Sequence, residues 1–312
     1  MALQGKFEHS HVIIKVIQWL GCIFVLSIPA MGSIFLFQQP LSVSALKWVQ
    51  LIQTVAVFLL PPLCMAYLWS TQPLQWLSLR NTPKLKTFKG VNSAVWAVAL
   101  MLVALPAINL LGYLNQQMNL PAFLEPLEQW MKTAEENATL LTEQFLNVTT
   151  CGGLIINVLL MALLPAVAEE LTFRGVLQRL FSPKRHASND LVNQSTPHVA
   201  IWCSAILFSA IHMQFYGFVP RMLMGALFGY MLVWTGSLWV PILMHFTNNT
   251  MAVLLYFVAL RQGWDMEKVD AIGTNDTLWL GVVSMILTIV GIYAFRRSTT
   301  MSNASSRMSN GN

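Results

Sequence analysis

Long apolar stretches alternate with short polar segments along most of the chain. A helix needs about 20 apolar residues to cross the hydrocarbon core of a bilayer. We therefore expect about eight transmembrane helices, at residues 12–37, 48–69, 91–114, 153–177, 198–212, 218–234, 238–260 and 278–295. The fifth and sixth stretches are short, and a bend at HMQFYG between them would reduce the number to seven. The pattern predicts an all-α protein, a polytopic membrane helical bundle.

The composition agrees with a multi-pass integral membrane protein that contacts membrane lipids. Of the 312 residues, 55% are apolar and only 10% are charged, whereas about a quarter of the residues in a soluble domain are charged. We attribute the net charge of +5 to topology and lipid contact. No basic patch with interleaved aromatic residues indicates binding to nucleic acid.

The distribution of Lys and Arg predicts the orientation, because positive residues gather on cytoplasmic loops. With eight helices, twelve of them fall on the side of the N-terminus and five on the other side. The five are Lys47, Lys132, Arg221, Arg261 and Lys268. Both termini are therefore predicted to be cytoplasmic, in the cell (inner) membrane if the protein is bacterial.

This layout divides the chain into six segments. Residues 1–11 are an N-terminal cytoplasmic segment, 12–114 contain three transmembrane helices, and 115–152 are an outer-surface amphipathic segment. Residues 153–260 are a transmembrane core with unusual polar residues, 261–297 hold the last helix with its preceding loop, and 298–312 are a polar tail expected to be disordered.

Two adjacent carboxylates interrupt the fourth apolar stretch, in the sequence AVAEELTFRG. Glu170 and Arg174 are four residues apart, so they share a helix face and are expected to pair. Glu169 points about 100° away and is left without that partner. Pro165 lacks a backbone N–H, which predicts a kink or a free carbonyl in the preceding turn.

Further polar residues lie on the fifth and seventh stretches. Phe208 precedes His212 by one turn, so its ring is expected beneath the imidazole, and His245 and Asn249 share a face. A carboxylate, two imidazoles and a carboxamide can activate a water or bind a metal. Structural ion pairs and interhelical hydrogen bonds are the alternative, but they do not require two neighbouring acids together with two intramembrane histidines.

The expected boundaries place the carboxylate and the first imidazole at different depths. Glu169 lies near the inner end of its helix, whereas His212 lies about 21 Å along a helix that enters from the same side. A water-filled cavity open to the cytoplasmic side is expected to join them.

The three motifs Glu169-Glu170-x-x-x-Arg174, Phe208-x-x-x-His212 and His245-x-x-x-Asn249 resemble those of the CAAX-protease and bacteriocin-processing (CPBP, Abi) family of intramembrane endopeptidases. The resemblance covers mainly residues 153–260. It implies hydrolysis of peptide bonds in membrane-associated or lipid-modified protein substrates, in a bundle of about eight helices.

The resemblance also implies roles for the motif residues. Glu169 is expected to be the general base, His212 to hold the water or a metal, and His245 and Asn249 to donate to the oxyanion. Glu170 and Arg174 are expected to fix the fourth helix and to tune the field around Glu169.

The resemblance leaves open a metallo- or a glutamate-type mechanism. Glu169, His212 and His245 are the candidate ligands for zinc or another divalent metal, and Glu170 is then the candidate base. We favour the metal-free mechanism, because Asn249 is a natural oxyanion donor and a poor zinc ligand.

Two other functions compete with proteolysis. A non-catalytic membrane protein, in an immunity or scaffold role, could retain the same bundle, although every motif residue is present. A proton-relaying transporter is disfavoured because no repeat relates the two halves of the chain.

Overall fold

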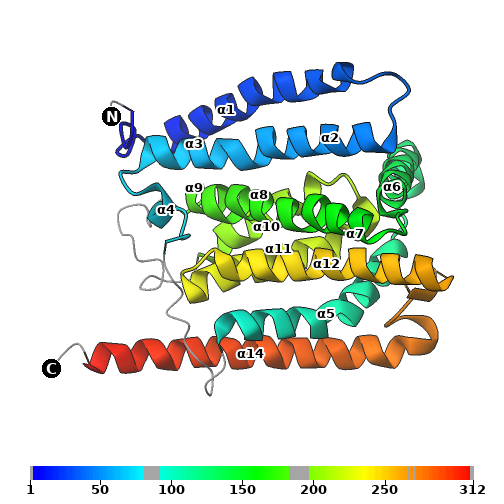
Figure 1. The fold of residues 1–312 in the computed structure, drawn as a ribbon. Helices are drawn as coiled ribbons and strands as arrows, with labels where there is room; N and C mark the ends of the chain where they lie inside the picture. Colours follow the sequence, from blue (N-terminus) through cyan, green and yellow to red (C-terminus); the bar gives the residue numbers. More distant parts are fainter. Residues whose placement is uncertain (1–2, 81–91, 183–196, 266–267, 270, 310–312) are drawn as a thin grey trace.

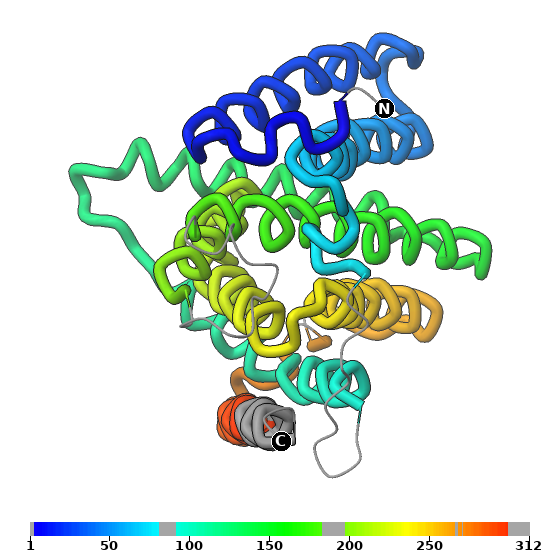
Figure 2. The backbone as a smooth tube through the Cα atoms, turned by 90° about the vertical axis from the view of Figure 1, so that its left-hand side faces the viewer, coloured from blue at the N-terminus to red at the C-terminus, as the bar shows by residue number. Residues whose placement is uncertain are grey.

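A computed structural model describes residues 3–80, 92–182, 197–265, 268–269 and 271–309. Every regular element within these residues is a helix, which confirms the predicted all-α bundle. Most of the long helices run roughly side by side, and both chain ends lie at one end of the bundle (Figure 1). Figure 2 views the molecule from that end, where α14 is seen nearly end-on and several other helices are seen obliquely.

In the N-terminal half, three long helical stretches run along the bundle, namely α1 (Val12–Gly32) with η1 (Ser33–Leu36), α2 (Val43–Thr54) through the π-helical η2 (Val55–Leu59) to α3 (Leu60–Trp69), and α5 (Ser93–Gln116). A further helix, α6 (Glu125–Leu146), lies across them (Figure 1). The short elements are α4 (Pro73–Trp76) and η3 (Ala122–Leu124).

The C-terminal half begins with five consecutive helical segments, α7 (Cys151–Asn157), η4 (Val158–Leu163), α8 (Leu164–Glu170), η5 (Leu171–Leu177) and α9 (Gln178–Leu180), which form one continuous helix called the rod below. The elements that follow are α10 (His198–Ala210), η7 (Phe215–Gly217), α11 (Phe218–Thr235), α12 (Trp239–Gln262), η8 (Asn275–Thr277) and α14 (Leu278–Ser309).

Each of the eight expected stretches forms a helix, and seven helices in the described part of the chain are long and apolar enough to cross a membrane. The exception is α10, whose 13 residues span about 20 Å, less than the hydrocarbon thickness of about 30 Å. The second span begins at Val43 rather than Trp48, because Lys47 is accommodated inside it. The ammonium of Lys47 donates to the side chain of Asn157 at 2.7 Å and to the carbonyl of Phe145 at 3.0 Å.

The predicted amphipathic segment is a single helix, α6, that lies across the bundle at the end away from the chain termini (Figures 1 and 2). It buries Met131 and Phe145 and exposes Trp130 and Leu140. This pattern is typical of a helix in the interfacial region of a membrane.

The positions of the chain ends agree with an even number of crossings, while the cytoplasmic location of those ends stays a prediction. Lys84, Lys86, Lys89, Lys184 and Arg185, which contribute to that prediction, lie outside the described residues. The helix α14 continues to Ser309, through most of residues 298–312, which were expected to be disordered. Extending an existing helix is easier than nucleating one.

The centre of the bundle is α12, which packs against α5, α11 and the rod formed by α7 to α9. The interface between α11 and its neighbours depends on small residues. A Cβ at Gly229 would lie 2.7 Å from the side-chain oxygen of Gln178 and 2.9 Å from a methyl group of Ile201. Close packing at Gly229 therefore holds α11 against both α9 and α10.

Candidate active site

The two glutamates end α8, between two π-helical segments, η4 and η5. The segment before Pro165 is π-helical, which agrees with the disturbance predicted from the missing N–H. Single π-helical turns are frequent at functional sites. The rod thus carries Glu169 and Glu170 where its backbone departs from regular α-helix.

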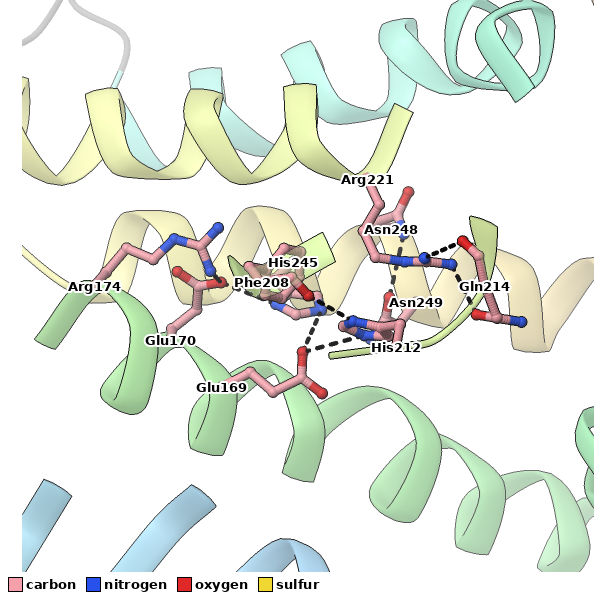
Figure 3. A network of polar contacts seen from close by, with 10 residues as sticks. All are labelled: Glu169, Glu170, Arg174, Phe208, His212, Gln214, Arg221, His245, Asn248 and Asn249. Carbon is pink, nitrogen blue, oxygen red and sulfur yellow. Dashed lines mark hydrogen bonds and ion pairs between the residues drawn. The ribbon is translucent and has the colours of Figure 1, made fainter. Parts of the chain in front are cut away.

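Glu170 and Arg174 form the predicted ion pair, and both side chains are completely buried. The guanidinium donates to Glu170 Oε1 at 2.6 Å and to the carbonyl of Gly225 at 2.9 Å. Its Cζ atom lies 4.5 Å from the ring centroid of Phe208. This sealed pair occupies the side of the site nearer the chain termini (Figures 1 and 3).

Glu169 points away from that pair and toward the two histidines (Figure 3). Its Oε2 lies 3.8 Å from His212 Nε2 and 3.9 Å from His245 Nε2. This oxygen is buried and has no hydrogen-bond partner among the described residues. The spacing is too long for direct hydrogen bonds and suits a small molecule or ion between the three groups.

Hydrogen bonds on the far side of each ring orient both imidazoles. His245 Nδ1 lies 3.0 Å from Glu170 Oε1, and His212 Nδ1 lies 2.7 Å from the carbonyl oxygen of Phe208. Because a carboxylate and a carbonyl only accept hydrogen bonds, each Nδ1 carries a proton. In the neutral rings, both Nε2 lone pairs therefore face Glu169.

The aromatic residues around the imidazoles limit their movement. The Phe208 ring centroid lies 5.1 Å from that of His212, as expected, and 5.8 Å from that of His245. Phe228 stacks on His245 at 5.4 Å. These rings hold both imidazoles in place and exclude water from the sealed side of the site.

Asn249 lines the same cavity as the histidines. The side-chain NH₂ group of Asn248 donates to Asn249 Oδ1 at 3.2 Å. With its oxygen engaged in this way, the Asn249 side chain keeps its NH₂ group as a donor. Asn248 therefore orients the carboxamide of Asn249.

The mismatch in depth becomes smaller with the observed helix ends. Glu169 lies eleven residues before Leu180, where the rod ends, rather than eight before Leu177, and this places it about 17 Å from that end. His212 lies two residues beyond α10, about 21 Å from the start of that helix. The two side chains therefore meet within the bundle.

A cavity of about 380 Å³ joins the motif residues. Its lining includes Thr142 and Leu146 of α6, so it extends toward the end of the bundle opposite the chain termini. The cavity therefore does not open on the side of the chain termini, so an opening to the cytoplasm and cytoplasmic termini cannot both hold. The sealed ion pair and the aromatic rings fill that side instead.

The lining also contains polar residues that sequence reasoning did not assign to the site, namely Asn248, Gln214 and Arg221. Arg221 was predicted to be an outer loop charge, whereas it lies inside α11. Its position within the expected helix at residues 218–234 was the available signal, since an ionisable residue in a span usually faces a cavity or a partner.

The predicted metal ligands face one another, but their spacing is open. As the side chains stand, no group of three or more His, Cys, Asp or Glu residues in the described part of the chain is placed to hold a metal ion. The chemistry of the set fits a metal, because both imidazoles are anchored through Nδ1, as metal-binding histidines commonly are. Metal binding by Glu169, His212 and His245 stays a prediction.

Comparisons with known proteins agree with the resemblance of the motifs. A segment of 120 residues is 31% identical to the uncharacterized protein YpbD of Bacillus subtilis (strain 168). The match covers 37% of this chain and 54% of that protein, so it spans about half the length of the relative. No solved structure matches the chain.

The family comparison covers the part of the chain that builds the cavity. Residues 152–251 match the family described as "Type II CAAX prenyl endopeptidase Rce1-like". This range includes Glu169, Glu170, Arg174, His212, His245 and Asn249, all of which lie around one site. Over residues 152–251, this multi-pass membrane protein therefore carries a domain of the Rce1-like type II CAAX prenyl endopeptidase family.

Proposed function

We propose that the protein is an intramembrane endopeptidase that hydrolyses peptide bonds of membrane-associated or lipid-modified protein substrates. The observation that carries the proposal is the convergence of Glu169 Oε2 with the Nε2 atoms of His212 and His245, at 3.8 and 3.9 Å. If these groups served only as structural ion pairs or interhelical hydrogen bonds, they would be in direct contact with a partner. The open spacing suits a water that is held for reaction.

In this proposal Glu169 is the general base. A water between the three groups donates one hydrogen bond to Glu169 and the other to an imidazole Nε2. These two hydrogen bonds orient the lone pair of the water oxygen. As the water oxygen attacks the substrate carbonyl carbon, Glu169 takes a proton from the water. The π electron pair of the carbonyl group moves to the carbonyl oxygen. Such proton transfer contributes about 10²–10⁴-fold to the rate.

Asn249 is the proposed donor to the oxyanion that forms in this step. Its NH₂ group is available because its oxygen accepts from Asn248. His245 can donate from Nε2 only when both ring nitrogens carry protons, since Nδ1 already faces Glu170. The intermediate collapses as Glu169 returns its proton to the leaving nitrogen, which yields a carboxylic acid and an amine.

The sealed pair supports this chemistry indirectly. Glu170 Oε1 accepts from Arg174 and faces His245 Nδ1, so it sets the orientation and the proton position of His245. Because Glu170 is completely buried and engaged in this way, we disfavour it as the base in either mechanism. Glu170 and Arg174 are therefore proposed as positioning residues.

A metal is compatible with the same residues. Glu169, His212 and His245 would hold zinc or another divalent ion, which would supply a Lewis acid to the site. We favour the metal-free mechanism, because an asparagine such as Asn249 is a natural oxyanion donor and a poor ligand for zinc. Elemental analysis of the purified protein and cleavage with and without a chelator separate the two mechanisms.

The function is tested with the full-length protein in liposomes and a library of lipid-anchored peptides, including prenylated C-terminal peptides suggested by the family description. We expect cleavage by the unmodified protein and loss of cleavage in Glu169→Gln, detected by mass spectrometry of the products. Full activity of Glu169→Gln in a cell-based assay of the biological function would exclude peptide hydrolysis as that function. It would favour an immunity or scaffold role.

A further inference from the structure

Arg221 is a cation near the N-terminal end of the membrane-spanning helix α11. The carboxylates of Glu135 and Glu169 interact with its charge only at longer range. Its guanidinium donates to Gln214 Oε1 at 2.7 Å and to the carbonyl of Gln214 at 3.3 Å. No ion pair within 4.0 Å joins Arg221 to a carboxylate of the described residues. Glu135 of α6 instead accepts from the backbone N–H of Tyr216, at 3.2 Å.

The contrast with Arg174 makes this arrangement informative. Arg174 is paired with Glu170, whereas the side chain that holds Arg221 is a neutral amide. An ionisable residue in a membrane span usually faces a cavity or a partner. The guanidinium of Arg221 is therefore suited to receive an anion from outside the described chain.

Arg221 also stands between two cavities. It lines the 380 Å³ cavity that contains Glu169 and His212, and a second cavity of about 550 Å³. Together with Met224, it belongs to both linings. The second lining includes the polar residues Asn109, Tyr113, Gln116, Thr274 and Asn275.

The guanidinium packs closely against the backbone of Gly217, where an added Cβ would lie 3.2 Å from Arg221 Nη2. Arg221 is the one Lys or Arg among the described residues that line either cavity. The one carboxylate among the described residues of the two linings is Glu169. A single cation matches a monovalent carboxylate better than a phosphate with higher charge.

We propose that Arg221 is a specificity-determining residue that binds a carboxylate of the substrate peptide, with the second cavity holding the peptide on that side of the scissile bond. The guanidinium fork pairs with a carboxylate through two parallel hydrogen bonds. The carboxylate is either the C-terminus of the peptide or an acidic side chain. This inference rests on the proposed peptidase function and adds a substrate feature to it.

The test uses one lipid-anchored peptide library in four versions, with a C-terminal acid or amide combined with an internal Glu or Gln. Cleavage is measured with the full-length protein in phosphatidylcholine liposomes. Binding is measured separately by fluorescence anisotropy with Glu169→Gln in nanodiscs of the same lipid. The variants are Arg221→Gln, Arg221→Lys and, as the matched control, Arg261→Gln at the exposed C-terminal end of α12.

We expect the unmodified protein to prefer one carboxylate version over its amide by about tenfold or more, because a charge-assisted hydrogen bond contributes about 1.5–3 kcal/mol. Arg221→Gln should abolish the preference, Arg221→Lys should retain part of it, and Arg261→Gln should leave it unchanged. The version that is preferred identifies the source of the carboxylate.

The two readouts separate failure of this inference from failure of the proposed function. If no peptide is cleaved but Glu169→Gln still binds acids better than amides, and the added Arg221→Gln change removes that preference, the carboxylate site stands without proteolysis. If the acid and amide versions are cleaved equally fast and bound equally tightly, the inference is overturned. This comparison uses no Arg221 variant, so it does not depend on whether such a variant folds. Competition by phosphatidylglycerol that displaces the acidic peptide from Arg221 would assign the site to lipid and also overturn it.

Discussion

Glu169 and Glu170 are neighbours in the chain, yet they lie in opposite environments. Glu170 is completely buried, bonded to Arg174 and in contact with His245 Nδ1. Glu169 faces a cavity with an oxygen that has no hydrogen-bond partner among the described residues. A rotation of about 100° between successive helical residues is enough to place one carboxylate in a structural pair and the other in a reactive position.

The comparison shows how one short motif can serve stability and chemistry together. The sealed side pairs Glu170 Oε1 with Arg174 and His245, although Glu170 Oε2 and Arg174 Nε are buried without a hydrogen-bond partner among the described residues. The contact of Glu170 Oε1 with His245 also orients this imidazole. The open side leaves acceptor atoms facing a common point. Changes on the sealed side should therefore affect folding, whereas changes on the open side should affect activity alone.

The sharpest test of this division is Glu169→Gln. We expect peptide cleavage to fall by about 10²–10⁴-fold, because an amide cannot accept the proton of the water. The thermal unfolding midpoint of the purified protein should stay unchanged. A large loss of stability would mean that Glu169 also belongs to the structural side.

Arg174→Met should produce the opposite result on the sealed side. Removing the guanidinium leaves Glu170 as an uncompensated buried charge, so the free energy of unfolding should fall by about 3–5 kcal/mol. Unfolding in mixed detergent micelles measures the change. The double variant Glu170→Leu with Arg174→Met should recover part of the stability without recovering activity, because His245 loses the acceptor of its Nδ1 proton.

Asn249→Ala tests the open side at a second position. Loss of an oxyanion donor should lower the cleavage rate by about 10²–10³-fold, with KM nearly unchanged. Asn248→Ala should have a smaller effect, since it removes only the hydrogen bond that orients Asn249. An equal loss of stability in both variants would instead favour a purely structural role for these amides.

Gly225→Ala should give the smallest effect, on the sealed side. The added Cβ would lie 3.1 Å from Arg174 Nη2 and 3.1 Å from Phe208 Cδ1. We expect the free energy of unfolding to fall by about 1–3 kcal/mol, as is usual for overpacking. Gly21→Ala in α1 is the matched control, because nothing lies within 4 Å of its Cβ, and its stability should not fall.

Much of this architecture could be predicted from one sequence. The eight apolar stretches correspond to observed helices, because the requirement to satisfy backbone groups in lipid leaves helices as the main solution for such segments. The pairing of Glu170 with Arg174 and the packing of Phe208 beneath His212 follow from spacing within one helix. Interactions between residues four apart depend little on the rest of the fold.

Features that depend on several helices were predicted less well. The predicted opening of the cavity to the cytoplasm and the predicted cytoplasmic termini cannot both hold, since side chains from α6 line the far end of the cavity while Arg174 and Phe208 fill its near end. Arg221 was counted as a loop charge, because an outer helix end and a cavity wall look alike along the chain. The end of the rod mattered as well, since its extension to Leu180 brings Glu169 closer to the depth of His212.

The sequence by itself determined the membrane-spanning class of this protein, the candidate polar residues and the division of the two glutamates into paired and unpaired, because these follow from hydrophobic length and helical periodicity. Only the tertiary structure decided that Glu169, His212 and His245 meet at one point, that both imidazoles turn their Nε2 atoms toward the carboxylate, and that Arg221 joins two cavities. The physical reason is that helix packing, through close contacts such as those at Gly225 and Gly229, sets distances between residues that are far apart in the chain.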